Sequence, residues 1–555
     1  MKQKKLLLLG ANNGQVQLIK AAKKEGYYVI ACDYTDDNPG LPFVDKHYQV
    51  SYLDQEAVLS IAKQENVDGV IGNTDPAMPM VAYIATQLGL VGNKPESIEP
   101  FVSKTAFREL QEEVGLYCPK HIESDNLSVI ETAIESFDFP IIVKPSVSAG
   151  TQGTTKIFSN QKERLRDAFQ VCKNFSRDGK VTVEEYVEMP SLEMIEGDIF
   201  VNEDTFLWNI FTTRRSILAP MVPRTYIFPS LISEEESDVI KSSLTKLFKK
   251  AGVRHGFYNV EMYFTTKKEL FIIEINPRQG GHLIPQLIEQ HTGVDCNKLL
   301  VTTAAGDFDY YHSVLKKKLE SNLVTFHVVF PKYTGYLDKI NISPEIARYV
   351  TDTIYRKNVS QVTRCENGTH WIAYVTLRFP DRKTQLDYCG EKIDQYVTAE
   401  VKDRQIPVVD GTMPYKLLYN FMKGDAYDFF VPKLAKVQRT PEDYAAQFSA
   451  YCTIAYDLDD DNQIKGMVAG YTHNLRIKGW SYVAEVYVNS AHRGKGLGEE
   501  LFKTYIDYCK SRHLKGIWLN VKEENIPAQN LYKKLGFVFD ETYNENGYLK
   551  MDLKL

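Results

Sequence analysis

The chain has 555 residues, which is too long for one hydrophobic core and predicts three or four domains. Hydrophobic residues make up 43% of the chain and charged residues 25%, as in globular proteins, so a largely disordered chain is excluded. A net charge of -6 argues against a nucleic-acid or anionic-membrane binder, and the longest apolar runs are far shorter than a spanning helix.

We expect a cytoplasmic protein, because the basic N-terminus leads directly into a short strand without the apolar region of a signal peptide. The eight cysteines are scattered singly, without a C-x-x-C pair, and indicate neither a zinc site nor a disulfide framework. Residue patterns do not give the oligomeric state, for which a homodimer is the candidate.

Residues 1–100 begin with a pattern typical of a doubly wound parallel sheet. An apolar strand at Lys5–Leu9 is followed by a glycine turn, a helix that ends near Glu25 and a second strand at Val29–Asp33. The sequence therefore predicts a Rossmann-like α/β domain at the start of the chain.

Two features of this domain resemble ligand sites, but a structural interpretation is better for both. Gly10 and Gly14 do not complete the G-x-G-x-x-G pattern, so we reject a dinucleotide site. Asp75 follows the strand Val67–Ile71, where such sheets often bind ligands. Capping of the next helix is the better interpretation of this aspartate.

A lysine lies inside the apolar strand 140–145. Lys144 needs a negative partner there, and the small-residue loop that follows, which contains Gly150 and Gly153, allows backbone N–H groups to close over phosphate. A nucleotide triphosphate is the natural partner. The strand 181–187 leads into a hinge whose backbone groups suit the edge of an adenine ring.

The segment 257–281 predicts a β-hairpin with a polar turn at 265–268. Antiparallel pairing brings Glu261, Glu274 and the amide oxygen of Asn276 to one face, and two buried like charges require compensation. A hard divalent cation, Mg2+ or Mn2+, supplies it. Solvent-facing glutamates are the alternative for either residue alone.

The pattern E-I-N-P-R-x-G-G at 274–281 resembles the metal-binding strands of the ATP-grasp superfamily, which activates carboxylates as acyl phosphates. The resemblance implies that Lys104 and Lys144 contact the phosphates of ATP and that Arg278 lies beside the transferring group. It further implies a nucleotide hinge at Glu184, Glu185 and Val187 and a ribose ligand at Glu193. The metal ligands are then Glu261, Glu274 and Asn276.

The same resemblance implies that residues 1–100 form the domain that precedes the grasp, and that residues 311–410 form a subdomain that shapes the acceptor pocket. The Gly150–Gly153 loop is expected to close as a lid, because an acyl phosphate hydrolyses in water. Arg214 and Arg215 are candidates for binding the substrate carboxylate, with surface arginines as an equal alternative.

The last domain begins near residue 411. A strand at 484–488 precedes R-x-x-G-x-G at a helix N-terminus, where exposed N–H groups and the helix dipole suit a pyrophosphate. With the segment 521–537, this pattern resembles GNAT acetyltransferases, which bind acetyl-CoA. The resemblance implies cofactor contacts at Val488, Arg493, Gly494, Gly496, Gly498 and Asn525.

The GNAT resemblance also implies that Tyr532 protonates the departing thiolate, although a tyrosine with a satisfied hydroxyl in the core is the alternative. Glu485 is the candidate base for the amine, directly or through water.

The sequence therefore predicts a multidomain α/β and α+β enzyme with domains at 1–100, 101–310, 311–410 and 411–555. We expect an ATP-dependent ligase that joins a small-molecule carboxylate to an amine, such as an amino acid or amino sugar, and a fused N-acetyltransferase. The alternatives are a bicarbonate-using carboxylase-type enzyme and a regulatory protein that binds ATP and acetyl-CoA.

Overall fold

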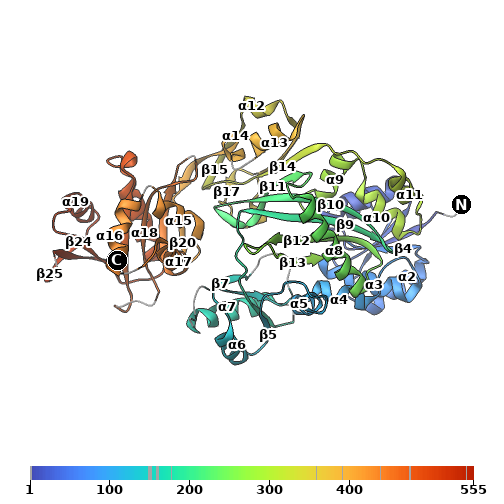
Figure 1. Cartoon of the computed structure of the whole chain (residues 1–555), viewed down its shortest axis with the longest axis horizontal. Coiled ribbons are helices and arrows are strands. Elements are labelled where there is room, and N and C mark those ends of the chain that lie inside the picture. The colour runs from blue at the N-terminus through green and yellow to red at the C-terminus, as the bar shows by residue number, and fades with distance from the viewer. Residues whose placement is uncertain are drawn as a thin grey trace.

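The computed structural model describes residues 3–555 apart from 148–152, 158–159, 161, 177, 358, 390–391, 425, 438, 460, 474–476 and 546. The N-terminal domain lies toward one end of the long axis and the C-terminal domain lies at the other end (Figure 1). No helix in this described part is both long and apolar enough to cross a membrane.

The N-terminal sheet has four parallel strands in the order β3-β2-β1-β4, as the strand, turn and helix pattern predicted. Leucines on both faces of β1 are completely buried, which is the pattern of a parallel sheet covered by helices. The elements are β1 (Lys5–Leu9), α1 (Val16–Lys24), β2 (Tyr28–Asp33), β3 (Lys46–Gln49), α2 (Gln55–Glu65), β4 (Gly69–Ile71) and α3 (Met78–Leu88).

A small antiparallel sheet follows, in the order β5-β8-β6-β7. Its elements and the two helices before it are α4 (Pro95–Val102), α5 (Lys104–Glu113), β5 (His121–Ser124), α6 (Leu127–Ala133), β6 (Ile141–Pro145), β7 (Thr155–Ile157), α7 (Lys162–Phe175) and β8 (Val181–Glu185). This sheet protrudes from the body of the molecule beside the hairpin of β12 and β13 (Figure 1).

The largest sheet has eight strands in the order β13-β12-β9-β10-β11-β14-β18-β16. Its strands are β9 (Glu193–Asn202), β10 (Thr205–Ser216), β11 (Ala219–Phe228), β12 (His255–Phe264), β13 (Leu270–Asn276), β14 (Leu323–Val329), β16 (Val350–Tyr355) and β18 (Ala373–Phe379). Its helices are α8 (Glu234–Ala251), α9 (Ile284–Thr292), α10 (Cys296–Ala304) and α11 (Asp309–Lys316).

Helix α10 fastens this sheet to the N-terminal domain. Leu8 of β1, Leu299 of α10 and Phe326 of β14 belong to one hydrophobic core. A Cβ atom added at Gly69 would lie 2.4 Å from the carbonyl oxygen of Ala304, so only glycine allows β4 and α10 to approach so closely.

The region predicted as a separate subdomain, 311–410, contributes three strands to the large sheet. It also forms a three-stranded sheet in the order β17-β15-β19. The remaining elements are β15 (Thr334–Ile342), α12 (Pro344–Ala347), β17 (Gln361–Val362), α13 (Arg382–Cys389), α14 (Ile393–Tyr396) and β19 (Val397–Gln405). The exact boundaries of the domains stay a prediction.

The C-terminal sheet has seven strands in the order β20-β21-β22-β23-β24-β26-β25. Its strands are β20 (Val408–Asp410), β21 (Thr453–Leu458), β22 (Ile464–Tyr471), β23 (Trp480–Val488), β24 (Gly516–Lys522), β25 (Val538–Glu545) and β26 (Tyr548–Lys554). Its helices are α15 (Tyr415–Lys423), α16 (Tyr427–Val437), α17 (Pro441–Tyr451), α18 (Leu497–Ser511) and α19 (Ile526–Lys534).

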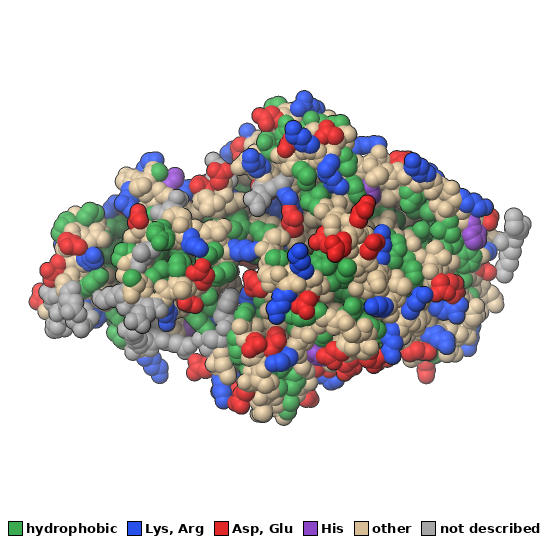
Figure 2. Space-filling view, in the orientation of Figure 1, with side chains coloured by type: hydrophobic (Ala, Val, Ile, Leu, Met, Phe, Trp, Pro, Cys, Tyr) green, Lys and Arg blue, Asp and Glu red, His purple; other side chains and the backbone are tan. Residues whose placement is uncertain are grey.

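A buried aspartate joins this sheet to the rest of the chain. Asp457 of β21 accepts hydrogen bonds from both terminal nitrogens of Arg404 in β19, at 3.0 and 3.2 Å, and from the Tyr333 hydroxyl at 2.8 Å. Lys465 completes the set of partners at 2.6 Å. On the face shown in Figure 2, basic and acidic side chains are interspersed, in keeping with the modest net charge.

A buried ion pair joins the small sheet to helix α5 and the large sheet. The guanidinium of Arg108 donates to both carboxylate oxygens of Glu184, at 3.1 and 3.3 Å, and to the carbonyl oxygen of Ile272 in β13 at 3.1 Å. Lys144 approaches the same carboxylate at 2.7 Å. Arg108 and Glu184 are 1% and 2% exposed, so the interaction is shielded from water.

Replacing Arg108 should therefore destabilise the protein strongly. We expect Arg108→Met to lower the free energy of unfolding by roughly 3–5 kcal/mol, because Glu184 loses its main buried partner. Thermal unfolding followed by circular dichroism measures the effect. The double variant Arg108→Met/Glu184→Gln should recover part of the loss, since it also removes the charge that is left unpaired.

The exposed arginine Arg166, which pairs with Glu131, provides a matched control. Arg166→Met should change stability by no more than about 0.5 kcal/mol. Equal effects of Arg108→Met and Arg166→Met would show that the buried pair does not hold these elements together.

Candidate functional site

The predicted hairpin is confirmed, and its pairing places the two glutamates directly opposite each other. Glu261 of β12 pairs with Glu274 of β13. On the other side of β12, Glu261 pairs with Glu196 of β9, a residue that sequence reasoning missed. Three carboxylates therefore form a row across three neighbouring strands.

This row is short of positive charge. Burial, and next the charges of Glu196 and Glu274, raise the pKa of Glu261 to about 8. Arg215 lies close to two of the carboxylates, at 3.6 Å from Glu196 and 3.5 Å from Glu261. The charge of Arg278 also acts on Glu261 and Glu274. Three carboxylates beside two guanidinium groups still form a donor set that suits a hard divalent cation.

A second row of polar groups lies beside the first. Asn259 pairs with Asn276 on one side and with Asp198 on the other. The Asp198 carboxylate accepts from the Gly280 N–H at 2.8 Å and from the Asn259 amide at 2.9 Å. A Cβ atom added at Gly280 would lie 2.9 Å from both partners, which explains the glycine in the motif.

Arg278, the arginine of the same motif, is bound by side chains of the N-terminal domain. The guanidinium of Arg278 contacts both carboxylate oxygens of Asp75. Its Nε atom lies 2.8 Å from one oxygen, and its Nη2 atom donates to the other at 3.1 Å. Asn73 accepts from the Gln279 N–H at 3.1 Å. The prediction that Asp75 caps a helix is wrong: it lies in the first turn of the 3-10 helix Asp75–Ala77, and its carboxylate turns to Arg278 instead.

Lys144 has the negative partner that its apolar strand required, but the partner is Glu184 on the adjacent strand β8. Burial lowers the pKa of Lys144 to about 8. Burial alone would raise the pKa of Glu184, yet the charges of Arg108 and Lys144 lower it to about 2. Both side chains line the cavity that also contains the carboxylate row.

The hinge that follows β8 is tied down through its backbone. The Glu185 N–H donates to the Lys120 carbonyl at 2.9 Å, and the Val187 carbonyl accepts from the Tyr263 hydroxyl at 2.7 Å. The Glu185 carboxylate accepts from the Asp138 N–H. Residues of the hinge line the cavity, so its edge is accessible from there.

Lys104 is the first residue of α5, and its amine donates to the Ser146 carbonyl at 3.4 Å. It lines a neighbouring cavity of about 260 Å³, together with Glu274 and Asn276. Of the predicted glycine loop, Gly150 lies outside the described residues. Gly153 has a φ of +75° and lies against Phe175.

The two adjacent arginines of β10 have different surroundings. Arg215 lines the cavity, whereas Arg214 forms an ion pair with Glu193. Neither Arg214 nor Glu193 is among the residues that line the cavity, because side chains on a strand alternate between faces. The ribose role of Glu193 stays a prediction, and the geometry gives it no support.

The main cavity has a volume of about 400 Å³. It extends from the hinge past the carboxylate row to Tyr226, His282 and Gly368, which come from β11, from the segment before α9 and from the segment between β17 and β18. The Tyr226 hydroxyl and the His282 Nδ1 atom lie 2.7 Å apart. His282 has a left-handed φ of +47°, which is strained for a residue with a side chain.

The C-terminal domain has a second site at the point where two parallel strands separate. Strands β23 and β24 are paired from Trp480–Gly516 to Val483–Leu519, and no pairing between them is recorded beyond that point in the described residues. Both strands continue, so the backbone from Ala484 to Val488 borders an opening. An extended ligand can lie along strand edges that diverge in this way.

The glycine-rich turn after β23 has the conformation that its sequence predicted. Gly494 and Gly496 have positive φ angles of +73° and +85°, and Gly496 is the N-cap of α18. The Arg493 side chain donates to the Val488 carbonyl at 2.8 Å. Gly498 lies in the first turn of α18, against Val488 and Leu531.

Asn525, predicted to lie near the cofactor, caps α19 by accepting from the Ala528 N–H at 3.2 Å. Tyr532 on this helix is 6% exposed, and its ring lies between Phe502 and Phe537. Burial, and next the charge of Glu485, raise its pKa, so the phenol is protonated at neutral pH.

Glu485 is buried in β23 and has two partners from the helices in front of it. Its carboxylate forms an ion pair with Lys433 of α16 and accepts from the Tyr444 hydroxyl of α17 at 3.1 Å. Sequence reasoning did not find Lys433 or Tyr444, because their helices meet β23 only in the folded chain.

Comparison with known families finds three matches along the chain. The model described as "PylC-like, N-terminal domain" matches residues 6–92, and the model described as "ATP-grasp domain" matches residues 137–286. The model described as "Acetyltransferase (GNAT) family" matches residues 420–537. ATP-grasp proteins use ATP with Mg2+, and GNAT proteins use acyl-CoA.

The carbamoyl phosphate synthase large chain of Campylobacter jejuni is 24% identical over 52% of this chain, which spans only 27% of that relative's length. The structure resembles an L-amino acid ligase from Bacillus licheniformis, with a TM-score of 0.59, 18% identity and coverage of 73% of this chain and 100% of the other.

It also resembles the biotin carboxylase domain of a 2-oxoglutarate carboxylase from Hydrogenobacter thermophilus, solved with MgADP, ADP and bicarbonate. The TM-score is 0.53 at 17% identity, over 79% of this chain and 99% of the other. At these identities the two structures show the fold alone. The protein is therefore an enzyme that combines a PylC-like N-terminal domain, an ATP-grasp ligase-type domain and a C-terminal GNAT acetyltransferase domain.

Proposed function

We propose that the protein joins a small carboxylate to an amine at the expense of ATP, and that its C-terminal domain transfers an acetyl group to an amine. The observation that carries the ligase proposal is the single cavity of about 400 Å³ that contains the hinge, Lys144, the carboxylate row and Arg215. ATP and a second substrate can therefore bind side by side in the same cavity.

The donor set fits the metal that the family uses. Glu261 and Glu274 face each other across the hairpin, and the Asn276 amide nitrogen donates to Glu274 at 3.2 Å. These residues would hold Mg2+, which supplies positive charge to the oxygens of the transferring phosphoryl group when it is bound. The raised pKa of Glu261 supports this assignment, because a cation relieves the repulsion that raises it.

Arginines hold the reacting groups in place. The substrate carboxylate binds Arg215, and one of its oxygens attacks the γ-phosphorus as the bond to the ADP oxygen breaks. Arg278, fixed by Asp75, lies on the phosphate side. The amine nitrogen then attacks the acyl carbon, phosphate leaves, and the amine proton passes to solvent or to a nearby base.

In the second domain, the pyrophosphate of acetyl-CoA binds the turn from Arg493 to Gly498 at the N-terminus of α18. The neutral phenol of Tyr532 gives its proton to the departing thiolate. Glu485 accepts the proton of the attacking amine, directly or through water, and Lys433 and Tyr444 position its carboxylate.

A bicarbonate-using carboxylase-type reaction is the second candidate. The similarity to a biotin carboxylase domain that was solved with bicarbonate favours it. In that reaction Arg215 would bind bicarbonate instead of a larger carboxylate. A regulatory protein that only binds ATP and acetyl-CoA would not need the facing carboxylates of Glu261 and Glu274.

The decisive experiment measures phosphate release from ATP and Mg2+ with amino acids, amino sugars and small carboxylates, singly and in pairs. We expect release that requires both a carboxylate and an amine. Mass spectrometry should find a product lighter by one water than the sum of the two substrates. Release with bicarbonate alone would support the carboxylase-type reaction, and no release with any pair would support the regulatory protein.

Two variants should separate the two activities. We expect Glu274→Gln to lower ATP-dependent product formation by about 100-fold or more, because it removes one charge from the metal site. Acetyl transfer from acetyl-CoA to amines should not change. Tyr532→Phe should lower acetyl transfer by about 100-fold and leave phosphate release unchanged.

The two assays are run on both variants and on the wild type, with thermal unfolding as a control for folding. A Tyr532→Phe variant with full acetyl transfer would contradict the role of its hydroxyl as proton donor. Loss of both activities in either variant would contradict two separate sites.

A further inference from the structure

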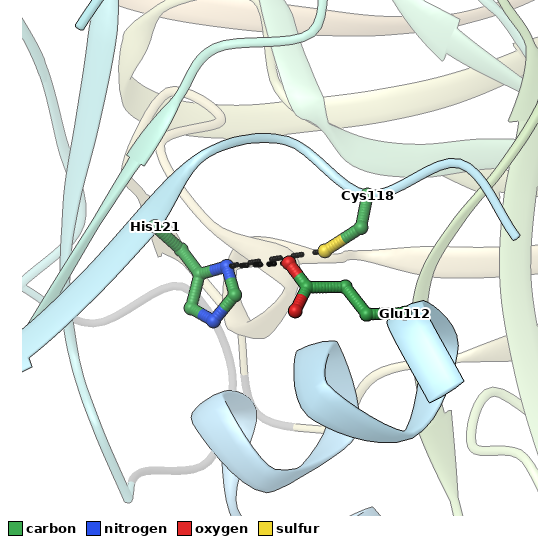
Figure 3. Close-up of side chains that lie close together, drawn as sticks. All are labelled: Glu112, Cys118 and His121. Carbon is green, nitrogen blue, oxygen red and sulfur yellow. Dashed lines mark hydrogen bonds and ion pairs between the residues drawn. The ribbon is translucent and has the colours of Figure 1, made fainter. Parts of the chain in front are cut away.

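A cysteine, a histidine and a glutamate lie close together outside the two sites described above. Glu112 comes from the last turn of α5, Cys118 from the loop that follows, and His121 is the first residue of β5. Figure 3 shows their polar atoms turned toward one another. The absence of a C-x-x-C pair and of a Cys/His cluster in the sequence predicted no zinc site. Cys118 and His121 meet Glu112 only in the folded chain.

The distances are close to those of a tetrahedral metal site. His121 Nδ1 lies 3.9 Å from Cys118 Sγ and 4.0 Å from Glu112 Oε1, and all three ligand atoms lie within 4.8 Å of one another. Tetrahedral Zn2+, with bonds of about 2.0–2.3 Å, places its ligand atoms roughly 3.3–3.6 Å apart. The two distances from His121 therefore need to shorten by about half an ångström, and Glu112 must also move toward Cys118.

The surroundings allow this contraction. The Glu112 side chain is 58% exposed and can rotate, whereas His121 is 12% exposed and held in place. The present hydrogen bonds of the thiol, to the carbonyl oxygens of Pro119 at 3.5 Å and Arg108 at 3.7 Å, are long. His121 Nδ1 lies 3.2 Å from the Pro119 carbonyl oxygen. A bound metal ion would take the place of this single hydrogen bond of the imidazole nitrogen.

We propose that Glu112, Cys118 and His121 bind a divalent transition-metal cation, with Zn2+ as the preferred ion, and that this cation clamps helix α5 to strand β5. Sulfur, nitrogen and carboxylate ligands together favour Zn2+ over Mg2+, and three protein ligands leave the fourth position to water. The cysteine must lose its proton to bind, so each cation that binds releases one proton to the solvent.

The location connects this cluster to the nucleotide hinge. Helix α5 also carries Arg108, one turn before Glu112, and Arg108 holds the Glu184 carboxylate. His121 pairs directly with Glu184 in the small sheet. A cation between α5 and β5 would thus fix the two elements that flank Glu184, and it would alter the affinity of the hinge for ATP.

Cobalt titration of the full-length protein tests the site. With excess Mg2+ present to occupy the carboxylates of the hairpin, we expect one Co2+ to bind with a thiolate-to-cobalt charge-transfer band in the near ultraviolet, and Zn2+ to abolish the band by displacement. Cys118→Ser should lose the band, and Glu112→Gln should bind cobalt at least about tenfold more weakly. Cys365→Ser, which alters a half-buried cysteine elsewhere, should behave like the wild type.

Cobalt binding without a sulfur band, or an unchanged band in Cys118→Ser, would overturn the site. Unchanged affinity in Glu112→Gln would overturn the glutamate as a ligand, and this exposed position keeps the test valid if Cys118→Ser folds poorly. The affinity for a fluorescent ATP analogue should change at least about twofold with Zn2+ in the wild type and not in Cys118→Ser. An equal response of both proteins would overturn the coupling to the hinge.

Discussion

The ion pair of Arg108, Lys144 and Glu184 is the constraint on which the ligase half of the structure depends. An unpaired charge inside a protein is very costly, so the buried Glu184 carboxylate requires its two cations at hydrogen-bond distance. Those cations come from helix α5 and strand β6, and Arg108 also reaches the backbone of β13. Satisfying one carboxylate thus sets the position of the nucleotide hinge relative to the metal-binding hairpin.

The carboxylate row, in contrast to Glu184, is not fully paired with positive charges. Arg215 and Arg278 both lie near the three carboxylates of Glu196, Glu261 and Glu274. The raised pKa of Glu261 shows that burial and repulsion between the carboxylates outweigh these two positive charges. The Glu184 carboxylate on one wall of the cavity is therefore neutralised, whereas the carboxylates of the hairpin on the other wall are only partly compensated. A ligand with phosphates and a divalent cation matches this asymmetry, because it brings charge to the wall that lacks it.

Sequence patterns predicted the parts of the site that depend on local structure. Alternation and a polar turn predicted the hairpin, but the turn alone would place Glu261 opposite Ile273. A register shift between Glu261 and Met262, which the pattern does not reveal, brings Glu261 opposite Glu274. Glu196 was missed because its place beside Glu261 depends on the pairing of β9 with β12, strands that are separated by about fifty residues of chain. Asp75 was misassigned because its partner Arg278 belongs to another domain, and Lys433 was missed for a similar reason.

The contacts of Asp457 have a consequence for how the chain could be divided. Its carboxylate is buried on the acetyltransferase side, yet Arg404 and Tyr333 come from the ligase side. A gene cut between β19 and β20 would separate this carboxylate from those partners and leave Lys465 alone with it. Separation would therefore expose charged and polar groups on both sides that the fused chain pairs with each other, so we expect each half to be less stable alone than in the fused chain.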